Sequence, residues 1–199
     1  MSKERQKRML AEQEGNKMKE PAQQGDLLIT SGEWAGGITW DFFSCQSNRE
    51  MPELSLCTAA FCVVTYQGKL LIVEHANRGF ELPGGHVDPE EQLSLTVQRE
   101  VLEEVGARIL SPEYFGYKRV SPPKPIPHRD DPTKYYPFPH SFVPYFVAEA
   151  VELFDIPLAS DVKGTKLVTF EEAAQLFAPG HNHDKIVRQA LIYKGAQGV

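Results

Sequence analysis

Apolar residues gather in short runs along the first half of this chain, a pattern that is typical of strands. The longest run, residues 56–66, is rich in cysteine, alanine and valine and predicts a buried strand. A Gln-Gly turn joins it to a second apolar run at 69–74, so the two runs predict a hairpin. Shorter runs at 27–30 and 38–45, separated by two glycines, predict strands that precede this hairpin.

Helical spacing begins after the hairpin. Val97, Val101 and Val105 recur every four residues and predict a helix with one apolar face, which Gly106 ends because glycine readily adopts positive φ. The later pattern predicts a strand pair or one long bent strand at 107–120, strands at 141–151 and 166–169, a helical turn or two at 170–177 and a last helix at 183–193. Within the strand at 141–151, Pro144 indicates an edge or a bulge. Mixed strands with two or three helices predict an α/β fold in which helices sandwich a sheet.

Polar positions of the central helix carry the candidate chemistry. At 100° per residue, Glu103 and Glu104 fall within roughly 60° of Glu100, so three carboxylates share one stripe. A hard divalent cation would relieve their mutual repulsion. Gly84 and Gly85 precede the helix and allow the backbone to approach a ligand closely, with the carbonyl of Gly85 available as an oxygen ligand.

Residues 82–107 (LPGGHVDPEEQLSLTVQREVLEEVGA) resemble the signature of the Nudix hydrolases, and every fixed polar and glycine position of that signature is present. The weakest match is Ala107, where the family usually has a larger aliphatic residue. The resemblance implies a Nudix α/β/α sandwich with a mixed sheet over residues 27–199. Residues 1–26 are then interpreted as a mobile or peripheral N-terminal extension.

The resemblance also implies roles for the residues of this signature, which we call the Nudix box. Magnesium or manganese would be bound by the candidate metal ligands Gly85, Glu100, Glu103 and Glu104, with Glu103 as a further ligand or as the base that positions water. Arg99 is expected to orient a carboxylate of the loop, and Glu91 is its natural partner. Asp161 falls where the family often has an additional carboxylate, although it could instead pair with Lys163. The candidate catalytic residues are Arg99, Glu100, Glu103 and Asp161.

A proline-rich stretch, residues 120–139, holds seven of the fifteen prolines and is incompatible with a regular helix or central strand. Residues 136–141, at its end and just beyond it, resemble an array found downstream of the signature in the NADH pyrophosphatase branch of the family. The match is partial, since this chain has Lys134 and Tyr136 where that branch has Gln and Trp, and it lacks the four-cysteine zinc ribbon. The loop either binds the substrate or caps the core as a rigid aromatic-proline segment. The candidate substrate-binding residues are Phe80, Glu81, Tyr136, Phe138, His140 and Ser141.

The expected function is hydrolysis of the diphosphate linkage in a nucleoside diphosphate joined to another moiety, as in ADP-ribose, a nucleotide sugar or a dinucleotide. Two alternatives remain open: a catalytically inactive nucleotide-sensing module, and a house-cleaning nucleoside triphosphate pyrophosphatase. An isoprenoid diphosphate isomerase is disfavoured because that chemistry needs a positioned thiol and no cysteine adjoins the box in the sequence.

Charge and composition limit the kinds of molecule that this chain is expected to bind. A net charge of −6 argues against a broad nucleic-acid surface, which calls for clustered Lys and Arg. Residues 1–26 contain no apolar stretch long enough for a signal peptide or a membrane span. Three cysteines without CxxC spacing suggest reduced thiols and a cytoplasmic location. We therefore expect a small-molecule nucleotide partner, with no nucleic acid and no membrane; a homodimer is compatible. The one histidine cluster, residues 181–184, is interpreted without a metal, because His183 and Asp184 fit better as cap residues of the last helix.

Overall fold

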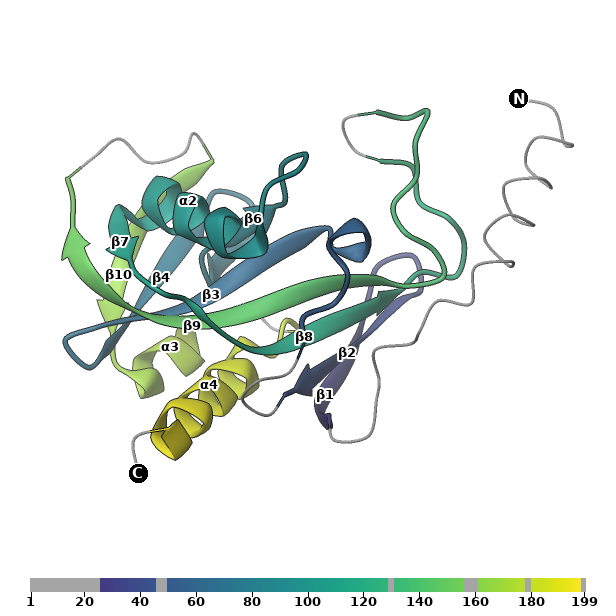
Figure 1. Ribbon diagram of the computed structural model, residues 1–199. Coiled ribbons are helices and arrows are strands. Elements are labelled where there is room, and N and C mark those ends of the chain that lie inside the picture. Colours follow the sequence, from purple (N-terminus) through teal and green to yellow (C-terminus); the bar gives the residue numbers. More distant parts are fainter. Residues whose placement is uncertain (1–25, 46–49, 129–130, 156–160, 178–179, 198–199) are drawn as a thin grey trace, which may run out of the picture.

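The structure is a computed structural model that describes residues 26–45, 50–128, 131–155, 161–177 and 180–197 of the 199-residue chain. The strands are β1 (Leu27–Trp34), β2 (Ile38–Ser44), β3 (Ala59–Tyr66), β4 (Lys69–His75), β5 (Gly79–Glu81), β6 (Gly84–His86), β7 (Ala107–Ile109), β8 (Glu113–Ser121), β9 (Ser141–Leu153) and β10 (Val162–Val168). The helices are η1 (Leu54–Leu56), α2 (Leu93–Val105), α3 (Phe170–Leu176) and α4 (His183–Gln197). The sheet runs in the order β1-β2-β8-β9-β3-β4-β10 (Figure 1).

Helices cover both faces of this sheet. On one face α2 packs its valines on β3, β4 and β9 around Cys62, Val73 and Phe146. On the other face α3 and α4 close a second core that contains Trp40, Phe42 and Ile186 among its largest side chains (Figure 1). Because β3 and β9 pair in parallel while the other neighbours are antiparallel, the sheet is mixed. The predicted α/β/α sandwich is confirmed.

Most predicted elements are present, with two refinements. The segment 107–120 forms two strands, β7 and β8, which both pair with β9 rather than with each other. Residues 54–56 form the short 3-10 helix η1, so the long buried strand begins at Ala59 rather than at Leu56.

The expectation that Pro144 marks an edge strand is wrong. Its strand, β9, lies in the interior of the sheet between β8 and β3. The parallel ladder with β3 begins one residue later, at Tyr145, and before it only an isolated bridge at Phe142 joins this side. The missing N–H of proline therefore falls in a gap of the ladder. The nearby register shift lies in β8, between Tyr114 and Gly116.

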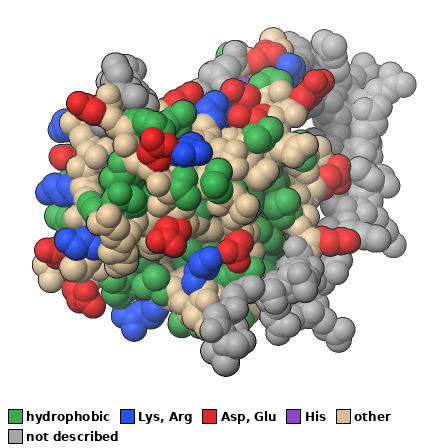
Figure 2. All heavy atoms as spheres, turned by 60° about the vertical axis from the view of Figure 1, so that its left-hand side comes forward, with side chains coloured by type: hydrophobic (Ala, Val, Ile, Leu, Met, Phe, Trp, Pro, Cys, Tyr) green, Lys and Arg blue, Asp and Glu red, His purple; other side chains and the backbone are tan. Residues whose placement is uncertain are grey.

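The predicted N-terminal extension lies outside the described residues except for Asp26, whose carboxylate accepts a hydrogen bond of 3.0 Å from the Tyr117 hydroxyl. None of the three cysteines forms a disulfide. No helix in the described part of the chain is long and apolar enough to span a membrane. Charged side chains of both signs are scattered over the face shown in Figure 2, and no continuous basic patch is visible there among the described residues.

Candidate functional site

Two glycines bring the loop before α2 into contact with the acidic stripe of that helix. Gly84 has a φ of +154°, and a Cβ there would collide with the backbone of Ala60 and Phe61. Its N–H donates a hydrogen bond of 2.9 Å to Glu104 Oε2. A Cβ on Gly85 would overlap the Glu100 carboxylate, with Oε2 only 2.8 Å away. A side chain is thus excluded at Gly84 by the neighbouring backbone, and at Gly85 it would displace the Glu100 carboxylate. The backbone of this loop lies directly against two carboxylates.

Arg99 holds the remaining acids of the box together. Its Nε and Nη2 donate hydrogen bonds of 3.0 and 2.9 Å to the two oxygens of Glu91, which is the pairing expected from the sequence. Its Nη1 donates to Glu100 Oε1 at 2.8 Å and lies 3.4 Å from Glu103 Oε2. A further bond of 3.0 Å from Nη2 to the carbonyl of His86 ties the helix to the loop. One guanidinium therefore fixes the orientation of three carboxylates.

The carboxylates of α2 differ in their surroundings. Glu103 is half exposed, with 53% of its side chain accessible, whereas only 7% of the Glu104 side chain is accessible. Burial raises the pKa of Glu104 to about 8, against the Gly84 N–H that lowers it and with the help of the Glu100 charge. Burial also raises the pKa of Glu100, although Arg99 opposes this. Carboxylate oxygens crowded into a poorly solvated place are a donor set that fits a hard divalent cation.

The side chains that the structure brings together here are carboxylates, whose oxygens suit a hard cation and not a soft metal. Glu100, Glu103 and Glu104, together with Gly85, would hold magnesium or manganese, which prefer oxygen ligands. Such an ion would activate water and neutralise charge that develops on a diphosphate.

A histidine that the sequence reasoning missed connects this site to two other acids. His75, the buried last residue of β4, places Nε2 3.4 Å from Glu104 Oε1 and 3.9 Å from Glu81 Oε2. Its Nδ1 lies 3.4 Å from Asp161 Oδ2. Burial, assisted by Arg78, lowers the pKa of His75, so the neutral ring prevails at neutral pH. The signal available in the sequence was a histidine that ends an otherwise apolar run and precedes Arg78 and Glu81.

Asp161 is therefore near the box but reaches it through His75. Its exposed carboxylate also lies 3.7 Å from Arg78 Nη2, and its backbone carbonyl accepts a hydrogen bond of 2.9 Å from the N–H of Ala76. Lys163, which the sequence offered as an alternative partner, is exposed in β10. The ion-pair contacts of Asp161 are instead to His75 and Arg78.

The proline-rich stretch 120–139, called the aromatic-proline loop below, lines one side of a cavity of about 610 Å³ beside the box with its residues His128, Lys134 and Tyr136. Tyr136 lies on its wall, with the ring 4.7 Å from that of His128 and the hydroxyl 3.5 Å from His86 Nε2. Asp88, which also lines the cavity, is 3.7 Å from Arg99 Nε. The loop that Arg99 holds therefore forms part of the wall of this cavity.

Other predicted substrate contacts lie elsewhere. Phe138 and His140 are not among the residues that line this cavity, and His140 Nδ1 lies 2.8 Å from the Ser121 hydroxyl. Ser141 is buried at the start of β9. Phe80 has Lys166 Nζ 4.7 Å from the centre of its ring, and Glu81 Oε2 lies 3.1 Å from Arg78 Nη1 and 3.9 Å from His75 Nε2.

The cavity also contains a thiol that the sequence reasoning placed away from the box. Cys57 lines it, but burial raises the pKa of this thiol to about 12. Its Sγ is 3.5 Å from the carbonyl of Glu53, so the proton is held in place. A protonated thiol of this kind is not a nucleophile at neutral pH.

Comparison with known proteins places this geometry in a family. A family model described as the NUDIX domain matches residues 56–190. A putative 8-oxo-dGTP diphosphatase of Bacillus subtilis is 45% identical over 58 residues, which are 29% of this chain and 37% of that protein. A MutT-like protein of Streptomyces ambofaciens is 39% identical over 72 residues, or 35% of this chain and 47% of the relative. The chain thus spans less than half the length of these two curated relatives.

A solved structure extends the likeness to the whole fold. The crystal structure of a point mutant of the pyrophosphohydrolase BsRppH of Bacillus subtilis aligns with a TM-score of 0.60 at 21% identity. The alignment covers 84% of this chain and 98% of that one, which supports the arrangement of helices around the sheet.

Proposed function

Since this chain belongs to the Nudix family, we propose that it is a metal-dependent pyrophosphohydrolase that cleaves the diphosphate linkage of a nucleotide. The observation that carries the proposal is the box itself: Arg99 holds Glu91, Glu100 and Glu103 in one network, while the Gly84 N–H holds Glu104. A sensor that had lost turnover would have no need for this arrangement of acids.

The residues of the chain divide the work among themselves. Gly85, Glu100 and Glu104 provide the most enclosed oxygen ligands, and magnesium or manganese bound there would supply the Lewis acidity for the reaction. Glu103 is the most exposed of the three helix acids, so it is the one best placed to accept a proton from an attacking water. Arg99 fixes the metal ligand Glu100 and the proton acceptor Glu103 relative to one another, because its planar guanidinium cannot rotate without breaking several hydrogen bonds.

For the substrate, we propose a nucleoside diphosphate joined to a second moiety, such as ADP-ribose, a nucleotide sugar or a dinucleotide. The cavity of about 610 Å³ beside the box is large enough for a ring beyond the diphosphate. Tyr136 offers a flat face on its wall, and Lys134 a positive charge. The loop was interpreted from the sequence either as a substrate contact or as a cap of the core, and the position of Tyr136 on the cavity favours the first.

One observation favours a second candidate, hydrolysis of nucleoside triphosphates. The relative with 45% identity over its matched 58 residues is named as a putative 8-oxo-dGTP diphosphatase. Both candidates use the same box and differ in what occupies the space next to it, so a direct comparison of substrates separates them.

The test is a substrate panel with magnesium and with manganese. Purified protein would be given ADP-ribose, a nucleotide sugar, a dinucleotide, dGTP and 8-oxo-dGTP, and products would be separated by chromatography. Hydrolysis in ¹⁸O-water, read by mass spectrometry, identifies the phosphorus atom that is attacked. A nucleoside monophosphate together with a phosphorylated second moiety supports the first candidate, whereas a monophosphate with pyrophosphate supports the second.

The matched control is the Glu103→Gln variant, which keeps the size of the side chain and removes its charge. Activity that persists undiminished in this variant, at a constant ratio to the purified protein over successive columns, would refute the role given to Glu103; activity that separates from the protein belongs to a contaminant. If the wild-type protein binds nucleotides but turns over none of them with either metal, the hydrolase proposal is wrong and the sensing module takes its place.

A further inference from the structure

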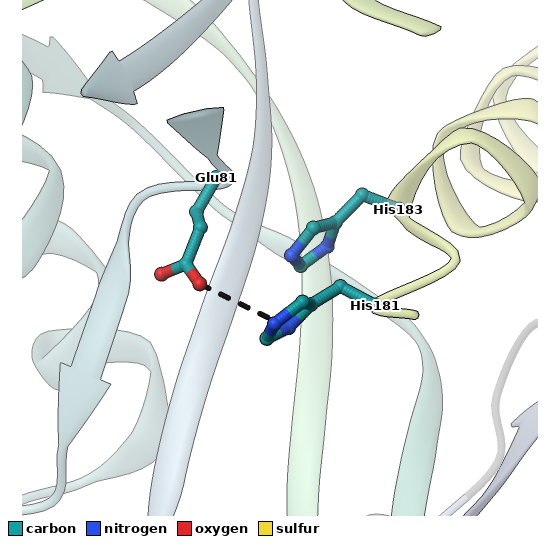
Figure 3. Close-up of side chains that lie close together, drawn as sticks. All are labelled: Glu81, His181 and His183. Carbon is teal, nitrogen blue, oxygen red and sulfur yellow. Dashed lines mark ion pairs between the residues drawn. The ribbon is translucent and has the colours of Figure 1, made fainter. Parts of the chain in front are cut away.

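Three metal-ligating side chains meet at a second place, next to the acidic stripe of α2, to which His75 links it by contacting both Glu81 and Glu104. Glu81 comes from the end of β5, His181 from the segment before α4, and His183 from the first residue of α4. One ligand atom from each side chain lies within 4.8 Å of the others. Figure 3 shows the two imidazoles stacked on one another, with the Glu81 carboxylate at the edge of the His181 ring. His181 Nδ1 is 3.8 Å from Glu81 Oε1.

The state of His183 is the most informative feature of this cluster. The residue is 3% exposed, and neither ring nitrogen has a hydrogen-bond partner. Buried polar atoms are nearly always paired, and a neutral imidazole offers one donor and one acceptor. The interpretation of His183 as a cap residue is therefore wrong, since the ring points into the interior beside Phe177 and His181. An unpaired buried nitrogen beside a carboxylate and a second imidazole indicates a site for a metal ion.

We propose that Glu81, His181 and His183 bind one divalent transition-metal ion of the zinc class. Two imidazoles and one carboxylate form a common three-residue zinc set, with water in the fourth position. Magnesium, which takes oxygen ligands, is disfavoured by the two nitrogen donors. His181 is one-third exposed, so the site is open to solvent on that side. The cluster shares no candidate ligand with the Nudix box, whose candidate donors are oxygens, although His75 lies between Glu81 of the one and Glu104 of the other.

The protonation of the histidines agrees with this assignment. Burial lowers the pKa of both His181 and His183, so both rings are neutral at physiological pH. Neutral imidazole is the form that binds metal. The histidines therefore need not release protons when the ion enters.

Two cations near the cluster compete with the ion. Arg78 Nη1 is 3.1 Å from Glu81 Oε2, and its side chain is about half exposed. It can turn into solvent when a metal takes over the carboxylate. Lys118 is buried with its Nζ 4.3 Å from the Trp40 ring centroid, and burial lowers its pKa to about 8. Removal of the competitor Arg78 should therefore tighten metal binding, which a structural role for the histidines alone does not predict.

A metal at this site would join β5 to the start of α4. Because α4 closes the core that contains Trp40 and Ile186, the ion would stabilise the C-terminal part of the domain. Binding should thus raise the thermal midpoint of the protein as well as change the spectrum of a coloured ion.

The experiment is a titration of metal-free protein with cobalt(II) in excess magnesium. Excess magnesium would fill the oxygen ligands of the box, and cobalt reports a nitrogen-containing site of low coordination number by strong visible absorption. We expect one equivalent to bind and zinc to displace it. Affinity should fall in His181→Ala by more than the roughly 10- to 100-fold that loss of an outer partner costs. His140→Ala, a histidine variant outside the cluster, should bind as the wild type does.

Two further variants keep the test decisive. Arg78→Gln should bind cobalt more tightly than the wild type, and Glu103→Gln should retain the full equivalent because it affects only the box. Circular dichroism checks that each variant is folded, and His181→Ala tolerates the change because its side chain is partly exposed. Absence of a bound equivalent in the wild type, or equal binding in His181→Ala, would overturn the proposal.

Discussion

Replacement of Arg99 by lysine tests whether this side chain orients the catalytic acids or contacts the substrate. Arg99 makes four bonds of 3.0 Å or less, two to Glu91 and one each to Glu100 and the carbonyl of His86. Lysine keeps the positive charge but lacks the planar fork, so it can retain about two of these four bonds. The acids would then be held less firmly, although the net charge of the site is unchanged.

The size of the effect follows from the bonds that are lost. Hydrogen bonds to charged groups contribute about 1.5–3 kcal/mol each when well buried, and Arg99 is 28% exposed, so about 1 kcal/mol per lost bond is a fair discount. We expect Arg99→Lys to lower the free energy of unfolding by about 2 kcal/mol. A similar loss of transition-state stabilisation corresponds to a fall in kcat of about 30-fold.

Steady-state kinetics at saturating magnesium and urea unfolding measure the two effects. Arg108→Lys is the matched control, because Arg108 also donates from Nε and Nη2, at 3.2 and 2.7 Å, but to Glu152 on an exposed surface. That variant should remain within about 0.5 kcal/mol of the wild type and keep its kcat. If Arg99→Lys raises KM and leaves kcat unchanged, Arg99 contacts the substrate and the orienting role is refuted.

Three further predictions concern acids, the loop and a buried cation. Glu103→Gln and Glu104→Gln should each lower kcat by about 100-fold at saturating magnesium. In metal-free buffer the free energy of unfolding of the wild type should fall as pH rises from about 4.5 to 8, because the buried Glu104 carboxyl has its pKa raised to about 8. Urea unfolding at several pH values should show no such fall in Glu104→Gln. Tyr136→Ala should weaken binding of a base-bearing substrate about tenfold in calorimetry, more than Phe138→Ala does, because only Tyr136 of the two lines the cavity; equal loss for a ribose-phosphate analogue would contradict a stacking role. Lys118→Met should raise the free energy of unfolding by about 1–3 kcal/mol at pH 7, since burial lowers the pKa of the Lys118 ammonium to about 8. This gain over the wild type should vanish between about pH 8 and 10.5, where the folded wild type has lost the charge and the unfolded chain still carries it. A gain that does not depend on pH would show that packing is responsible.

The Nudix box could be predicted because most of its contacts join residues that are close together in the sequence. The helix repeat alone puts Glu100 and Glu104 one turn apart, and Gly106, with a φ of +62°, ends α2 where the sequence indicated. The pairing of Arg99 with Glu91 spans only eight residues. Contacts of this range depend on one loop and one helix, so they can be predicted without knowledge of the rest of the fold.

The features that escaped prediction depend on the order of strands. Pro144 reads as an edge residue as long as its strand is considered alone, and only the position of β9 between β8 and β3 shows otherwise. His75 is similar, because the acids that it contacts, apart from Glu81, lie far from it in the sequence. Its contacts to Glu104 and Asp161 exist because β4 ends beside α2 and pairs with β10.

His183 is a different case, because the sequence did contain the signal. Together with Ile186, Val187 and Ala190 it occupies positions i, i+3, i+4 and i+7, and all four side chains are buried on the inner face of α4. A histidine at the start of a helix invites interpretation as a cap, and that interpretation considers only its place along the chain. The apolar stripe shows which face of the helix the His183 side chain is on, and the face determines whether the side chain is buried. A polar ring on such a stripe must either find a partner in the core or bind something there, which is why His183 carries the inference of a second metal site.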